Sequence, residues 1–171
     1  MSYATMTEEP RRRQALGLAG WLLVTAVAAG LGAIASANAQ AFYSQLTQPS
    51  WAPPAWLFAP VWSLLYAMMA VSAWMVWRIH GFQGRASKAL TLFIVQLGAN
   101  ALWTWLFFSW HLGAAAMAEI VLLWLLIAAT LGAFWPLDRK AALLLVPYLA
   151  WVSFASALTY AMWQLNPVML G

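Results

Sequence analysis

Few side chains in this sequence could carry acid–base, nucleophilic or metal chemistry. The 171 residues include eight Lys and Arg, four Asp and Glu, two His and no Cys. Glu119 is the one acid inside an apolar run, which makes it a candidate proton or cation site. Its place near the start of that run fits equally well an acid stabilised by a helix N-terminus. His80 and His111 follow consecutive apolar runs and would lie on opposite membrane faces, so we predict no metal site.

Aromatic and amide side chains recur at helical spacing in three of the apolar runs. Separations of three and four residues place such side chains on one face of each helix. The three stripes are Trp62, Tyr66 and Met69; Gln96, Asn100, Trp103 and Phe107; and Tyr148, Trp151, Ala155, Leu158 and Thr159. An amide facing lipid lacks hydrogen-bond partners, so the stripes should face the helix bundle. They either pack the helices together or, because flat rings pack helices poorly, enclose a slot for a flat apolar ligand.

The elements that would position these stripes are transmembrane helices. The chain is 65% hydrophobic and 7% charged, whereas a soluble domain is about 25% charged. Five runs have the roughly 20 apolar residues that a membrane crossing needs; they are residues 15–35, 56–77, 89–110, 114–134 and 141–163. Each must satisfy its backbone hydrogen bonds internally, which requires a helix. We predict an all-α membrane protein, a five-transmembrane-helix bundle over residues 15–163 with tails at 1–14 and 164–171, and we expect Pro147 to bend its last helix.

The basic residues lie on one side of this bundle. All eight fall in residues 11–13, 78–88 and 139–140, which five spans bring to the same membrane face. Positive loops stay in the cytoplasm, so we predict a cytoplasmic N-terminus and insertion into an inner membrane. Topology and contact with anionic membrane lipid account for the charge, and nucleic acid is not expected as a partner. The alternative is a secretory signal cleaved at residues 35–37, which would leave four spans.

The longest connection, residues 36–55, lies on the uncharged side. The string WAPPAW at 51–56 contains consecutive prolines, which give an extended and stiff course. This segment either covers the bundle as a lid or rests among the lipid headgroups. Tryptophans near the span ends fit an interfacial aromatic belt, whereas Trp21, Trp105 and Trp124 have no predicted role.

Several ordered motifs between Trp51 and Asn166 resemble the tryptophan-rich sensory protein (TspO) family, whose mitochondrial relative is the translocator protein or peripheral benzodiazepine receptor. The longest motif is Trp51-x-Pro53-Pro54-x-Trp56-x-Phe58-x-Pro60-Val61-Trp62-x-x-Leu65-Tyr66. The others are Gln96-Leu97-x-x-Asn100-x-x-Trp103, Ala129-Thr130 with Phe134, and Pro147-Tyr148-Leu149-x-Trp151. The similarity covers most of the chain.

The resemblance implies five transmembrane helices, usually as a homodimer, around a pocket that the first loop covers. It also implies binding of porphyrins such as protoporphyrin IX and haem, as ligands rather than as a required cofactor, and of benzodiazepine-type drugs and sterols in some members. By motif position the ligand-binding residues would be Trp51, Trp62, Tyr66, Asn100, Trp103, Tyr148, Trp151 and Ala155.

Three activities would share this pocket. The first is that of a membrane receptor or translocator. The second is that of an enzyme. In some bacterial members of the family the tryptophans that match Trp62 and Trp151 are implicated in light- and oxygen-dependent porphyrin breakdown, so these two would be its catalytic residues. The third is proton-coupled transport through Glu119. For this chain we expect a bacterial inner membrane, as the charge pattern favours. Some bacterial relatives are reported in the outer membrane, which is the alternative.

The chain also departs from the family pattern. Many members have Asn where Thr159 stands and Arg where Gln164 stands. Without that basic residue the sterol-recognition pattern after Tyr160 is incomplete, and we predict no specific recognition of cholesterol. The first span matches the family weakly. Its small residues Ala26, Ala29, Gly30 and Ala33 suit close helix contact and make it a candidate dimer face.

Overall fold

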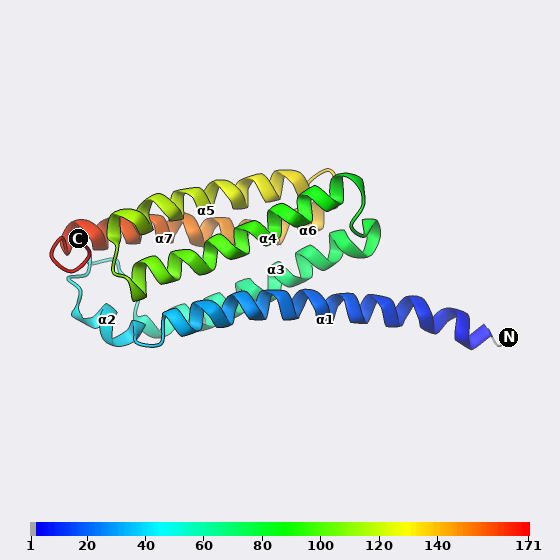
Figure 1. Cartoon of the computed structure of the whole chain (residues 1–171), viewed down its shortest axis with the longest axis horizontal. Coiled ribbons are helices and arrows are strands. Elements are labelled where there is room, and N and C mark those ends of the chain that lie inside the picture. Colours follow the sequence, from blue (N-terminus) through cyan, green and yellow to red (C-terminus); the bar gives the residue numbers. More distant parts are fainter. Residues whose placement is uncertain (1–2) are drawn as a thin grey trace.

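The computed structural model is an elongated helical bundle (Figure 1). It describes the backbone of residues 3–171 and the side chains of residues 11–171. The helices are α1 (Tyr3–Ala35), α2 (Ala39–Gln45), α3 (Phe58–His80), α4 (Gly84–Thr104), α5 (Gly113–Phe134), α6 (Arg139–Leu143) and α7 (Val146–Leu165). Within this described part, five stretches are long and apolar enough to cross a membrane: Arg11–Ala35, Ala55–His80, Gly84–Ser109, Gly113–Phe134 and Arg139–Leu165. The predicted all-α, five-span fold is confirmed.

The five long helices enclose a common interior. Helix α1 packs against α3 and α4, α4 packs against α5, and α5 packs against α7. Aromatic rings close the remaining gap between α3 and α7, with Trp62 and Tyr148 centred 6.2 Å apart and Phe58 and Trp151 5.9 Å apart. The N-terminal end of α1 projects beyond the bundle, and α2 lies at the opposite end near the C-terminus (Figure 1).

Tight packing is found where α3, α4 and α5 meet in the half of the bundle that carries α6. Ala73 and Val76 of α3, together with Leu90 and Phe93 of α4, are fully buried. The rings of Phe93 and Phe134 stack 6.1 Å apart. Lipid supplies little hydrophobic drive between helices, so close van der Waals contact of this kind holds the bundle together. The cavity described below lies toward the other end of the bundle.

Span five consists of two helices rather than one bent helix. Helix α6 ends at Leu143, and α7 begins at Val146 with Pro147 in its first turn, where a missing N–H breaks no helical hydrogen bond. The Leu145 N–H donates to Ala142 at 3.0 Å. The freed carbonyl of Ala141 accepts a 2.7 Å hydrogen bond from Ser72 of α3. The proline therefore starts a helix, and the break fastens span five to α3.

Two other helix ends differ from the sequence-based boundaries. Helix α1 already begins at Tyr3, so most of the segment assigned to an N-terminal tail continues the first helix. Helix α4 runs on into a π-helical turn at Trp105–Ser109, and the Ser109 hydroxyl donates to the Ala35 carbonyl at 2.8 Å. The end of span three is thereby joined to the end of span one. Caps and turns decide such boundaries, which hydropathy does not detect.

Candidate functional site

A cavity of about 620 Å³ lies in the half of the bundle that carries α2, between α1, α3 and α4 and beneath the loop that contains α2. We call it the central cavity. Its walls combine small side chains from α1 with aromatic and amide side chains from the other two helices. The residues that define it are Ala26, Ala29 and Ala33 of α1, Trp62 and Tyr66 of α3, and Asn100 and Trp103 of α4.

The small residues of span one make room for this cavity. Ala26, Ala29 and Ala33 recur every three or four residues and so share one face of α1. All three line the cavity, although their spacing had suggested direct helix contact. Bulkier side chains at these positions would fill the space between α1 and the aromatic wall opposite.

Asn100 connects the three polar aromatic stripes. Tyr66 of α3 donates a 2.6 Å hydrogen bond to the Asn100 side-chain oxygen. The Asn100 amide donates in turn to the hydroxyl of Tyr148 of α7 at 3.2 Å. Asn100 and Tyr148 are both buried. The stripes on three helices therefore face one another, and their polar atoms satisfy one another away from lipid.

The aromatic wall is built around two tryptophans. The ring of Trp62 lies 5.7 Å from Tyr66, inclined by 35°. Trp103 stacks on Phe107 at 5.7 Å with an interplanar angle of 15°. The indole N–H of Trp103 is buried and has no hydrogen-bond partner among the described residues. A buried donor of this kind is available to an acceptor on a bound molecule or to water.

Four of the eight predicted ligand-binding residues lie outside this lining. Tyr148 sits behind the wall, held by Asn100. Trp151 packs against Phe58, and its indole N–H has no partner in residues 11–171. Trp51 is half exposed and contacts the ring of Phe154, 5.8 Å away. Ala155 is buried in α7 but does not line the cavity.

The loop at residues 36–55 covers the end of the cavity. Tyr43 of α2 lines the cavity, and its hydroxyl donates to the Pro53 carbonyl at 3.0 Å. Burial raises the pKa of Tyr43, so its hydroxyl stays protonated and remains a donor at neutral pH. The Gln48 amide donates to the Tyr43 carbonyl at 2.7 Å. These bonds fold the proline-rich segment back onto α2, which the sequence had not predicted.

Asn166, just after α7, fastens the loop to the far end of the chain. Its side-chain oxygen accepts from the Thr47 N–H at 2.7 Å, and its amide donates to the Thr47 carbonyl at 2.9 Å. The same amide donates to Met162 at 2.8 Å. This role of Asn166 was not predicted from the sequence, because no spacing rule pairs positions 119 residues apart. An amide directly after the last apolar run was the only local signal.

The ionisable candidates lie apart from the cavity. Glu119 is buried in α5, does not line the cavity, and has no hydrogen-bond partner for either carboxylate oxygen within the described side chains. His80 lies 3.3 Å from the Leu137 carbonyl, whereas His111 stacks on Phe42 near α2. In residues 11–171 no three acidic, His or Cys side chains converge on a metal position.

Five membrane-spanning helices, three of which line a cavity large enough for a small-molecule ligand, define a multi-pass membrane protein. The family model described as "TspO/MBR family" matches residues 20–164. The chain therefore belongs to the TspO/MBR family, and the resemblance seen in the motifs is confirmed.

Similar proteins occur in bacteria and in mammals. Protein CrtK of Rhodobacter capsulatus is 42% identical over 147 residues, which cover 86% of this chain and 91% of that protein. Tryptophan-rich protein TspO of Chlorobaculum tepidum is 43% identical over 74% of this chain and 80% of its own length. The translocator protein of Bos taurus is 40% identical, with 74% and 76% covered.

Proposed function

We propose that the central cavity binds a porphyrin, such as protoporphyrin IX or haem, or a related flat apolar molecule, and that the protein acts as a membrane receptor or translocator for it. The observation that carries the proposal is the cavity of about 620 Å³, a size within the roughly 300–1,000 Å³ common for small-molecule sites. Its aromatic walls and the few polar groups among them, such as the Asn100 amide, also match the make-up of such sites. Membership of the TspO/MBR family supports a receptor or transport role.

The binding mode follows from the wall chemistry. A flat ring system would lie against Trp62 and Trp103, with the alanine face of α1 on the other side. Asn100 donates one amide hydrogen to Tyr148. A carboxamide carries two hydrogens, so one remains for the ligand. Together with the free indole N–H of Trp103, it would orient a carboxylate or carbonyl group.

The test is a titration of the full chain in detergent with protoporphyrin IX, followed by the shift of the porphyrin Soret band. Trp103→Leu should weaken binding about tenfold, equivalent to about 1.4 kcal/mol, because a stacking surface and a donor are lost. The matched control is Trp135→Leu, which removes an exposed tryptophan at the other end of the bundle and should bind as the wild type does. Equal affinity in both variants would exclude the proposed wall.

Photo-oxidative porphyrin breakdown is the second candidate, and one contact favours it. Trp62 lines the cavity, and its ring is centred 5.7 Å from that of Tyr66. Because it lines the cavity, its indole could donate an electron to a light-excited porphyrin bound there, with molecular oxygen as the oxidant. Trp151 does not line the cavity, and Trp62 is therefore the stronger of the two catalytic candidates. Under light and oxygen, porphyrin absorbance should decay faster with the wild type than with Trp62→Phe. Equal decay with and without protein would exclude the enzyme.

We also propose a cytoplasmic N-terminus, insertion into an inner membrane, and a homodimer. The first two rest on the basic residues, which all precede or follow spans at one end of the bundle. The dimer rests on the family resemblance. Reporter fusions should place the two termini on opposite sides of the membrane, with fluorescence only at the N-terminus. Native mass spectrometry should give twice the chain mass, and a monomer throughout would exclude the dimer.

A further inference from the structure

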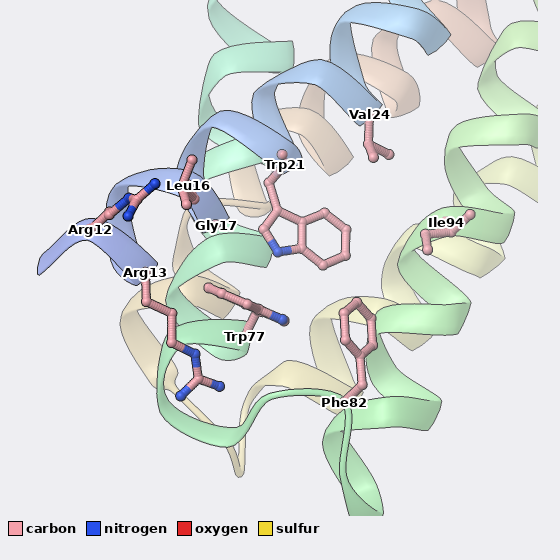
Figure 2. Close-up of a pocket in the computed structure, with 10 residues that line it drawn as sticks. Arg12, Arg13, Leu16, Gly17, Trp21, Val24, Trp77, Phe82 and Ile94 are labelled. Carbon is pink, nitrogen blue, oxygen red and sulfur yellow. The ribbon is translucent and has the colours of Figure 1, made fainter. Parts of the chain in front are cut away.

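A second hollow lies at the other end of the same three helices, in the half of the bundle that carries the basic residues. Its volume is about 910 Å³, and α1, α3, α4 and the loop between α3 and α4 line it (Figure 2). We call it the N-terminal groove. Arg12 and Arg13 mark its outer end, and Val24 and Ile94 mark its inner end.

The outer end of the groove is positively charged. The side chains of Arg12 and Arg13 are exposed, and the Arg13 guanidinium lies 5.8 Å from the centre of the Trp77 ring. Two acids have described side chains, and neither lines the groove. Glu119 is buried in α5, and Asp138 caps the start of α6. The outer end of the groove therefore carries two guanidinium groups, on different sides of α1 (Figure 2), and no carboxylate of the described residues.

Two glycines shape the interior of the groove. A Cβ atom at Gly17 would collide with the ring of Trp77, so this glycine allows the indole to lie directly against α1. A Cβ atom at Gly20 would meet nothing within 4 Å. The space beside Gly20 is therefore open, and the apolar side chains of Trp21 and Val24 from the same helix also line the groove.

The groove is long, and it runs along the helix axis. The twelve residue-to-residue steps from Arg12 to Val24 span about 18 Å at ~1.5 Å per step. One leaflet contributes about half of the ~30 Å hydrocarbon core. The groove thus descends from the level of the charged residues through about one leaflet. Phe82 and Ile94 on its rim are 57% and 46% exposed, which suits contact with an acyl chain.

We propose that the N-terminal groove is a binding site for an anionic phospholipid of the leaflet next to the N-terminus. The phosphate lies between Arg12 and Arg13, and one acyl chain follows α1 past Gly20 to Val24. A free anion would leave the apolar length unfilled, and a net-neutral lipid would leave the two guanidinium groups without a countercharge. The site is separate from the central cavity, and it stands whether or not that cavity binds a porphyrin.

The experiment is native mass spectrometry of the full chain in detergent, titrated with dioleoylphosphatidylglycerol or dioleoylphosphatidylcholine. Arg12→Gln combined with Arg13→Gln should weaken phosphatidylglycerol binding about tenfold, since each basic residue near a membrane surface contributes to anionic lipid binding. The control pair Arg11→Gln and Arg85→Gln removes the same charge outside the groove and should bind normally. Phosphatidylcholine should bind all variants equally weakly.

A second pair of variants tests the apolar part without changing charge. Gly20→Leu fills the empty space in the groove and should reduce phosphatidylglycerol binding. Gly30→Leu lies on the same helix, also has no atom within 4 Å of its added Cβ, and lines neither hollow, so it should bind as the wild type does. Both changes raise helix propensity by a similar amount, so a difference in lipid binding between the two variants reports on the groove and not on helix stability.

Each remaining result overturns the proposal. Equal losses in the two arginine pairs would indicate a general surface charge effect. Wild-type binding by the Arg12 and Arg13 variant would show that these two arginines do not hold the lipid. Wild-type binding by Gly20→Leu would exclude an acyl chain in the groove. Displacement of the lipid by inorganic phosphate would indicate a site for the headgroup alone.

Discussion

The central cavity and the N-terminal groove lie between the same three helices, yet they differ in almost every chemical respect. The cavity has an internal amide, aromatic walls and a fastened cover. The groove has arginines at one end, an apolar length and an exposed rim. Part of the difference arises along α1, where Ala26, Ala29 and Ala33 line the cavity, and Arg12, Arg13 and Gly20 line the groove. The same three helices thus form a covered aromatic cavity toward one end and a charged, apolar groove toward the other.

Trp21 stands where the two hollows meet. It lines the groove and is buried, and its ring contacts Phe82 at 5.9 Å and Phe93 at 5.7 Å. Its neighbour Leu22 already lines the central cavity. A tryptophan without a predicted role in the sequence therefore acts as the partition between the two sites.

The largest effect is expected from Trp21→Ala, which removes this partition. Deleting a buried aromatic ring costs about 3–5 kcal/mol, so the melting temperature should fall sharply. Ligand binding should then change at both sites together. Trp135→Ala, at an exposed position, is the control and should change neither. If the two sites respond independently in Trp21→Ala, the tryptophan does not separate them.

Asn166→Ala should loosen the cover of the cavity and leave the groove intact. It removes two hydrogen bonds to Thr47 and one to Met162, at a cost of about 1–3 kcal/mol. Limited proteolysis should cut the loop at residues 36–55 faster, and porphyrin should dissociate faster. Phosphatidylglycerol binding should stay at the wild-type level. An uncut loop in the variant would show that Asn166 does not hold the cover.

Ala29→Phe should block the cavity alone. Its ring would project into the space opposite the aromatic wall and should reduce porphyrin affinity at least about tenfold, or about 1.4 kcal/mol. The matching change in the groove is Gly20→Leu. Each variant should impair one ligand and spare the other in parallel Soret and lipid titrations. Loss of both ligands in either variant would mean that the sites are coupled.

Tyr43→Phe should have the smallest effect. It removes one hydrogen bond, to Pro53, worth about 0.5–1.5 kcal/mol, while the ring still fills its place over the cavity. A modest rise in porphyrin dissociation rate, measured by stopped-flow exchange, is expected. Lipid binding in the groove serves as the internal control. A dissociation rate as high as that of Asn166→Ala would reverse the ranking of the two fastenings.

The sequence predicted the spans and the inward faces of the stripes because these depend on hydropathy and helical period. Asn100 illustrates this, since a buried amide in a span must face polar partners, and it does so with Tyr66 and Tyr148. The depth of each residue relative to the cavity was not predictable. Tyr148 and Trp151 share a stripe with the right period, but the position of α7 places them behind the lining. Asn166 and Gly20 were missed because their roles depend on contacts or empty space that only the packed helices create.

The bond between Asn166 and Thr47 also determines when the cavity can be closed during synthesis. Thr47 leaves the ribosome 119 residues before its partner, after the first span and before the other four. The loop at residues 36–55 therefore stays unattached until the last helix has been inserted and Asn166 has left the ribosome. A chain that stops short of Asn166 would keep all five spans but could not fasten the loop, so the fastening requires synthesis to continue past the last span.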